Sequence, residues 1–127
     1  SYVAEIAGSA YAVGHKGMVY RLENPNMWTR MDEGLPSDFE AEAIHGFSKS
    51  EIYVVGYSGQ LWYYNGKEWS SDDLPTNAHL HCVTCAEDGN VYCAGRQGTL
   101  LKGKYRNWEV VLLEQTNETT TALAGTT

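Results

Sequence analysis

The densest group of side chains able to do chemistry is the run His79-Leu80-His81-Cys82-Val83-Thr84-Cys85. Two imidazoles and two thiols supply four nitrogen and sulfur ligands, the number that Zn²⁺ takes in structural sites. However, the second ligand pair of a zinc ribbon is missing, and neighbouring side chains of a strand point to opposite faces, which separates His81 from Cys82. Cysteine also behaves as a small apolar residue in a core. We therefore expect no metal site and no cofactor.

Pairs of carboxylates are a second candidate chemistry, since two of them flanking a cleft can hydrolyse glycosides. The pairs Asp32-Glu33 and Asp72-Asp73 both fall in segments that connect predicted strands, where acidic residues are commonly solvated. The chain contains no nucleophile-elbow, zinc-protease or phosphate-loop motif. These observations favour a protein that is not an enzyme.

Five residues are candidates for contacting a ligand that is bound but not chemically changed: Trp62, Glu40, Glu42, Asp72 and Asp73. Residues 37–75 carry seven acidic residues against two lysines, so their carboxylates could form a rim that attracts a cationic peptide, a metal ion or an amine. Acidic loops also keep proteins in solution, which is the simpler interpretation. Trp62 aligns with Tyr20 and Leu101 in the repeats described below, and its ring is a candidate surface platform for a ligand.

These residues belong to a pattern that occurs three times: Tyr, two small or apolar residues, Gly, two variable residues and Gly. It begins at Tyr11, Tyr53 and Tyr92, which lie 42 and then 39 residues apart. A tryptophan follows each copy, and the three tryptophans are Trp28, Trp69 and Trp108. Such a period is the signature of a repeat architecture. We predict repeats over residues 1–36, 37–75 and 76–115, within a single domain over residues 1–127 in which residues 116–127 add an extra strand or closing strap.

The middle repeat shows what one unit contains. Apolar or alternating segments over residues 39–47, 51–56, 60–64 and 67–71 predict four short strands, separated by turns such as Asn65-Gly66, a strong hairpin signal. No long stripe with helical periodicity is present. Four antiparallel strands per unit of about 40 residues are typical of a propeller blade. We therefore predict an all-β chain, a β-propeller with three four-stranded blades, in which the tyrosines pack between blades.

The segment from Ile52 to Trp69 resembles the bacterial β-propeller repeat of sialidase-like and photosystem-II-assembly-factor-like proteins, and more distantly kelch and WD blades. The resemblance implies a non-enzymatic interaction module that binds a protein or small ligand at the loop face of the central channel. The alternative that it implies is a carbohydrate-binding, lectin-like or sialidase-like propeller. The sialidase Asp-box is incomplete, because only Ala86-Glu87-Asp88-Gly89 resembles part of it.

The number of blades, the net charge and the number of cysteines predict the partners and the compartment. Propellers close with four or more blades, so three blades predict either a homodimer that completes a six-bladed ring, which we favour, or a piece of a longer chain. A net charge of −7 argues against nucleic acid as a partner. The sequence has no apolar run of the length that spans a membrane and no signal peptide. Three cysteines, an odd number, then favour reduced thiols and a cytoplasmic location.

Overall fold

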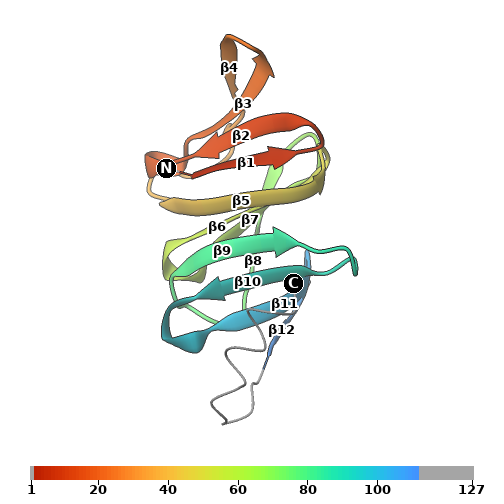
Figure 1. Ribbon diagram of the computed structural model, residues 1–127. Helices are drawn as coiled ribbons and strands as arrows, with labels where there is room; N and C mark the ends of the chain where they lie inside the picture. The colour runs from red at the N-terminus through yellow and green to blue at the C-terminus, as the bar shows by residue number, and fades with distance from the viewer. Residues whose placement is uncertain (1, 112–127) are drawn as a thin grey trace.

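The computed structural model describes residues 2–111, and its strands form three four-stranded antiparallel sheets in chain order (Figure 1). The first sheet contains β1 (Tyr2–Ile6), β2 (Ser9–Val13), β3 (Val19–Asn24) and β4 (Met27–Arg30). The second contains β5 (Ala41–Ser48), β6 (Glu51–Gly56), β7 (Leu61–Tyr64) and β8 (Trp69–Asp72). The third contains β9 (Leu80–Cys85), β10 (Val91–Gly95), β11 (Leu100–Lys104) and β12 (Asn107–Val110).

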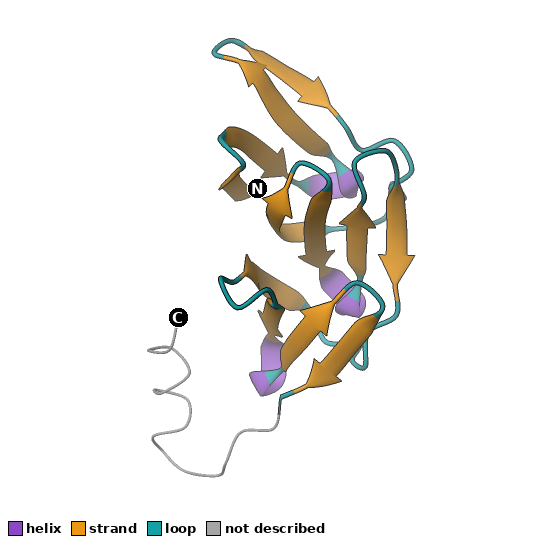
Figure 2. Ribbon diagram, turned by 90° about the vertical axis from the view of Figure 1, so that its right-hand side faces the viewer, coloured by secondary structure: helices purple, strands orange, loops and turns teal. Residues whose placement is uncertain are grey.

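The all-β class and the three four-stranded units predicted from the repeat are confirmed. The sheets stack in an open row, and β5 lies between β1 and β9 along one side of it (Figures 1 and 2). A closed ring and a second chain are not part of this structure. The predicted strap over residues 116–127 lies outside the described residues.

The strand positions of the second sheet follow from local sequence. β6 is buried along nearly its whole length because both of its faces are covered, as its almost continuous apolar sequence predicts. The Asn65-Gly66 turn joins β7 to β8. Gly66 has a φ of +99°, and the Asn65 side chain accepts hydrogen bonds from the backbone N–H groups of Lys67 and Glu68 at 2.8 and 2.9 Å. Only glycine adopts such a φ at little cost.

Two apolar clusters hold the stack together, one at each boundary between sheets. Tyr11 is buried between the first and second sheets and Tyr53 between the second and third, with no exposed surface on either side chain. Their packing between neighbouring units is therefore confirmed. The equivalent Tyr92 lies on the outer face of the third sheet and is only half-buried. Within the described residues, no helix has the length and apolar character needed to cross a membrane.

Candidate functional site

Three equivalent turns lie at the same end of the strands, along one edge of the stack, and each joins the second strand of a sheet to the third (Figure 2, purple). They are single turns of 3-10 helix: η1 (His15–Gly17), η2 (Tyr57–Gly59) and η3 (Arg96–Gly98). Their middle residues have positive φ values of 61°, 60° and 60° although none of them is glycine. The left-handed region costs such a residue about 1–2 kcal/mol. The first two residues of each turn are exposed and differ between copies, so this end presents a varied surface on a constant backbone.

An exposed aromatic ring stands at the centre of this end. Tyr57 is 40% exposed, and its ring packs against that of His79 with ring centroids 4.4 Å apart and ring planes tilted by 34°. His79 comes from the segment before β9 and accepts a 2.8 Å hydrogen bond at Nδ1 from the backbone N–H of Ser58. Tyr57 thus contacts the segment that leads to β9 while part of its surface stays exposed. Rigid, partly exposed aromatic side chains are the residues that most often dominate protein–protein interfaces.

Two of the predicted carboxylates lie at the start of β5, and each pairs with a histidine from a neighbouring repeat. Glu40 Oε2 lies 2.8 Å from Nδ1 of His15, and Glu42 Oε1 lies 3.2 Å from Nδ1 of His81. Both carboxylates keep more than a third of their side-chain surface exposed. The backbone N–H of Tyr57 also donates to the Glu40 carbonyl at 3.2 Å. We call Tyr57, His79, His15, Glu40 and Glu42 the turn cluster.

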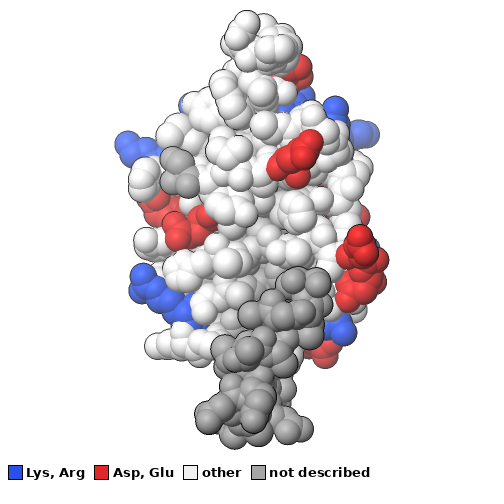
Figure 3. Space-filling view, in the orientation of Figure 1, with Lys and Arg blue, Asp and Glu red and all other residues white. Residues whose placement is uncertain are grey.

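The charge pattern agrees with this placement. In Figure 3, acidic and basic side chains gather along the two edges of the molecule, over the strand ends, while the face over β1, β5 and β9 is almost uncharged. On the edge where the turns lie, an acidic group is flanked above and below by basic groups. The turn end therefore offers charged and aromatic groups together, whereas the inner strands do not.

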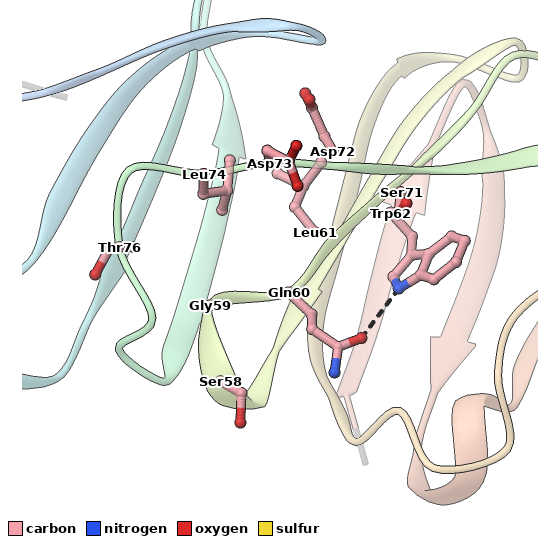
Figure 4. A pocket seen from close by; sticks show the side chains of 10 residues that line it. All are labelled: Ser58, Gly59, Gln60, Leu61, Trp62, Ser71, Asp72, Asp73, Leu74 and Thr76. Atoms are coloured by element: carbon pink, nitrogen blue, oxygen red, sulfur yellow. Dashed lines mark hydrogen bonds between the residues drawn. The ribbon is translucent and has the colours of Figure 1, made fainter.

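Trp62 lies in a different environment from the other predicted residues. It is half-buried on the face of the second sheet that packs on the first sheet, with its ring 6.4 Å from that of Phe39. Its Nε1–H donates to the side-chain oxygen of Gln60 at 3.3 Å (Figure 4). Most of this side chain therefore serves the packing between sheets, and its role as a ligand platform stays a prediction.

Asp72 and Asp73 are neighbours with different surroundings. Oδ2 of Asp72 accepts two hydrogen bonds of 2.6 Å from the third sheet, one from the backbone N–H of Arg106 and one from Nε1–H of Trp108. Asp73 is exposed. Both line an open hollow of about 270 Å³ between η2 and the segment that leads to β9 (Figure 4). Asp72 is thus engaged in joining two sheets, and Asp73 is the free carboxylate of the hollow.

The cysteines are all unpaired: Cys82 is exposed, Cys85 is half-buried and Cys93 is buried. Burial raises the pKa of Cys85 and the pKa of Cys93 to about 12, so both remain protonated at neutral pH. Within residues 2–111, no three His, Cys, Asp or Glu side chains are grouped so that they could hold a metal ion. Cys82 and Cys85 occupy opposite faces of the third sheet, because they pair with Ala94 and Val91.

Three residues of the turn cluster, Tyr57, His15 and His79, were not singled out as candidate site residues from the sequence. Tyr57 occupies the first variable position of the repeat, where the other copies have His15 and Arg96. That position gives no signal of function by itself, because variable turn residues are usually just solvated. His79 entered the sequence analysis only as a possible metal ligand. Its stacking on Tyr57, 22 positions earlier in the chain, depends on how the second and third sheets pack.

The structure is that of an all-β repeat protein in which an open hollow lies next to the exposed residues of η2. The chain is 44% identical over 128 residues to the immune protein Tsi7 of Pseudomonas aeruginosa. This similarity takes in 96% of the present chain and 42% of the relative, so the chain spans less than half of the relative's length. No family model matches the chain. No solved structure matches it.

These comparisons correct the resemblance to the bacterial β-propeller repeat and to kelch-like blades, because the relative is an immune protein and no propeller family model matches. The interpretation as a general interaction module for a protein or small ligand was wrong for the same reason, and so was the lectin-like or sialidase-like alternative. The physical cause lies in what the repeat residues do. Tyr53 fills a boundary between sheets and Gly59 adopts a positive φ, roles that any stacked four-stranded sheet needs. They specify a structural unit and not a family.

Proposed function

We propose that this chain acts in immunity against a protein toxin, which it neutralises by binding. The similarity to the immune protein Tsi7, 44% identity over 96% of this chain, is the observation that carries the proposal. The alignment takes in 96% of this chain and 42% of the relative, so toxin binding is assigned to the residues that the two proteins share.

The turn cluster is the surface that we assign to the toxin. Tyr57 supplies a large exposed ring that is already fixed in position, so little conformational entropy is lost when a partner covers it. Glu40 and Glu42 add negative charge beside the ring, and the whole chain carries a net charge of −7. A toxin with a basic surface would be attracted to this end, and such steering raises association rates.

In this proposal, the other predicted site residues either extend the acidic surface or hold the sheets that carry the turn cluster together. Asp73 lines the hollow next to η2 and extends the acidic surface toward the third sheet. Asp72 ties the third sheet to the second, which keeps His79 under Tyr57. Trp62 packs the second sheet on the first, which keeps His15 within reach of Glu40.

A growth assay and a binding measurement test the proposal. The chain is expressed in bacteria together with the toxin against which Tsi7 protects, and the affinity of the purified pair is measured by calorimetry. We expect restored growth and a stable complex. Tyr57→Ala should weaken binding by at least about 30-fold, the loss typical of an interface hot spot. Met27→Ala is the control, because this side chain is 53% exposed on β4, away from the turns.

Two outcomes would contradict parts of the proposal. If the chain neither binds nor protects, toxin binding by this segment is wrong. If Met27→Ala weakens binding as much as Tyr57→Ala, the toxin does not use the turn cluster. A third variant, Glu40→Gln with Glu42→Gln, should slow association and reduce its dependence on salt, which stopped-flow kinetics can measure.

We also infer that two chains complete a ring of six sheets, as the repeat arithmetic predicts. The support is that the described residues form three sheets in an open row. A reducing compartment, the cytoplasm, is inferred from the three unpaired cysteines, an odd number that cannot all pair within one chain.

A further inference from the structure

The turns η1, η2 and η3 share a backbone with two successive residues of positive φ, between 60° and 70° in every copy (Figure 2). The second of the two is always glycine: Gly17, Gly59 and Gly98. The first never is: it is Lys16, Ser58 or Gln97. Glycine adopts this region freely, whereas other residues are strained there. Each turn therefore avoids the strain at one position and keeps it at the other.

The second position is glycine for a steric reason. A Cβ on Gly17 would lie 2.5 Å from the carbonyl oxygen of Pro36, and a Cβ on Gly59 would lie 2.4 Å from that of Thr76. In both turns the obstacle is the segment that leads to the next sheet. The side chains at the first position of η1 and η2 are exposed. Steric fit therefore does not determine which residue stands at the first position.

Contacts within the chain do not offset the strain at Lys16 and Ser58. The hydrogen bond between Ser58 and His79 is made by the backbone N–H of Ser58 and not by its hydroxyl. In η1, the ion pair with Glu40 is made by His15 and not by Lys16. Among residues 2–111, neither Nζ of Lys16 nor Oγ of Ser58 has a polar partner.

A need for polar residues at the surface does not explain these two positions either. Asparagine and aspartate are polar and are less strained in the left-handed region than other residues, but neither occurs at the first position of any of the three turns. Elsewhere the chain has glycine at exposed positive-φ positions. At Gly8 and Gly34 a Cβ would meet no described atom within 4 Å, so glycine serves the backbone alone. Strained residues without an internal role are typical of functional sites.

We propose that the side chains of Lys16 and Ser58 contact the toxin, and that the strain in η1 and η2 is retained for these contacts. The inference rests on the proposed function and adds two residues to the surface that carries it. Both side chains donate hydrogen bonds, so they select acceptors on the toxin: a carboxylate for the Lys16 ammonium and a carbonyl oxygen for the Ser58 hydroxyl. Because His79 binds the backbone N–H of Ser58, the hydroxyl is presented on a fixed turn.

Glycine and alanine substitutions separate the backbone from the side chain. Lys16→Gly and Ser58→Gly remove the strain together with the polar group. Lys16→Ala and Ser58→Ala remove the polar group and keep a Cβ. In the free chain, each glycine variant should have a Tm about 1–4 °C above that of the alanine variant at the same position. If the glycine variants are not the more stable ones, no strain is retained and the inference is wrong.

Calorimetry with the toxin against which Tsi7 protects tests the contacts. The double alanine variant and the double glycine variant should both weaken binding by about 10-fold or more, because both lack the two donors. Ala7→Gly is the matched control. Ala7 is exposed, has a φ of 51° and lies at the opposite end of β2 from η1. Its replacement relieves the same kind of strain and should change the affinity by less than about 2-fold.

The remaining outcomes have distinct meanings. If the wild type binds the toxin and both double variants bind equally well, these side chains make no contact, although toxin binding itself stands. If only the glycine pair weakens binding, the turns act through rigidity and the inference is overturned. An equal loss in Ala7→Gly would overturn it as well. If the wild type fails to bind, the proposed function falls and this inference falls with it.

Discussion

The indole of Trp108 and the carboxylate of Asp72 join the third sheet to the second through a hydrogen bond of 2.6 Å from Nε1–H to Oδ2. The same oxygen accepts the backbone N–H of Arg106 at 2.6 Å. Two donors from one hairpin therefore depend on a single carboxylate of the neighbouring sheet. Hydrogen bonds with a charged partner are about twice as strong as neutral ones. Asp72 therefore holds two neighbouring sheets together and is not simply a solvated surface carboxylate.

Replacement of Asp72 tests that role. Asp72→Ala leaves both donors without their acceptor, and we expect the free energy of unfolding to fall by about 1.5–3 kcal/mol. Urea denaturation followed by tryptophan fluorescence measures the change. Asp73→Ala is the control, because Asp73 is exposed, and its effect should stay within about 0.5 kcal/mol. Equal effects of the two variants would mean that the hydrogen bonds of Asp72 contribute nothing.

The last glycines of the turns provide a second test. Gly59 and Gly98 both have a φ of +70°, so alanine meets the same backbone strain at either position, about 1–2 kcal/mol. A Cβ at position 59 would also lie 2.4 Å from the carbonyl oxygen of Thr76, whereas a Cβ at position 98 meets no described atom within 4 Å. Thermal denaturation should therefore show that Gly59→Ala is more destabilising than Gly98→Ala, by about 1–3 kcal/mol. Similar losses would show that the segment leading to β9 yields to the extra methyl group.

The acid sensitivity of the stack should depend on His45. Its Nδ1 accepts the backbone N–H of Cys85 at 2.8 Å, so protonation of this nitrogen removes the acceptor. Burial lowers the pKa of His45 below its ordinary value of 6.5. Below pH 6.5 the unfolded chain therefore binds more protons than the folded chain, and stability falls with pH until the lower native pKa is passed.

A variant isolates the contribution of His45 from those of the other titratable groups of the chain. His45→Asn keeps an acceptor at a similar position and cannot be protonated. As pH falls from 7.5 to 5, the free energy of unfolding of the wild type should decrease more than that of His45→Asn. A difference that stays constant over this range would show that His45 does not set the acid limit.

The thiols should differ in reactivity. Because burial raises the pKa of Cys85 and of Cys93 to about 12, neither forms a thiolate at pH 8, and only Cys82 should react with Ellman's reagent in the native protein. Cys82→Ser should remove the reaction. Rapid labelling of more than one thiol in the native state would contradict this order.

The sequence alone predicted the strand arrangement, because each strand depends on local patterns. β6 was expected over residues 51–56 and spans Glu51–Gly56, and the tyrosine, glycine and tryptophan of each copy lie where the repeat places them. The family resemblance drawn from the same residues was wrong, since they encode a sheet that must stack. The carboxylates Glu40 and Glu42 were found as candidates, but their histidine partners were not. Those partners are 25 and 39 residues away in the chain.

By itself, the sequence of this protein determined three equivalent sheets, because a period of about 40 residues repeats local strand and turn signals. Only the tertiary structure decided what the equivalent residues do. Tyr53 is fully buried and Tyr92 is not, although both occupy one repeat position. Likewise, the adjacent acids Asp72 and Asp73 differ because one reaches the third sheet and the other does not. Burial and hydrogen bonding of a residue depend on the sheet that packs against it, and the local sequence pattern around that residue does not specify this sheet.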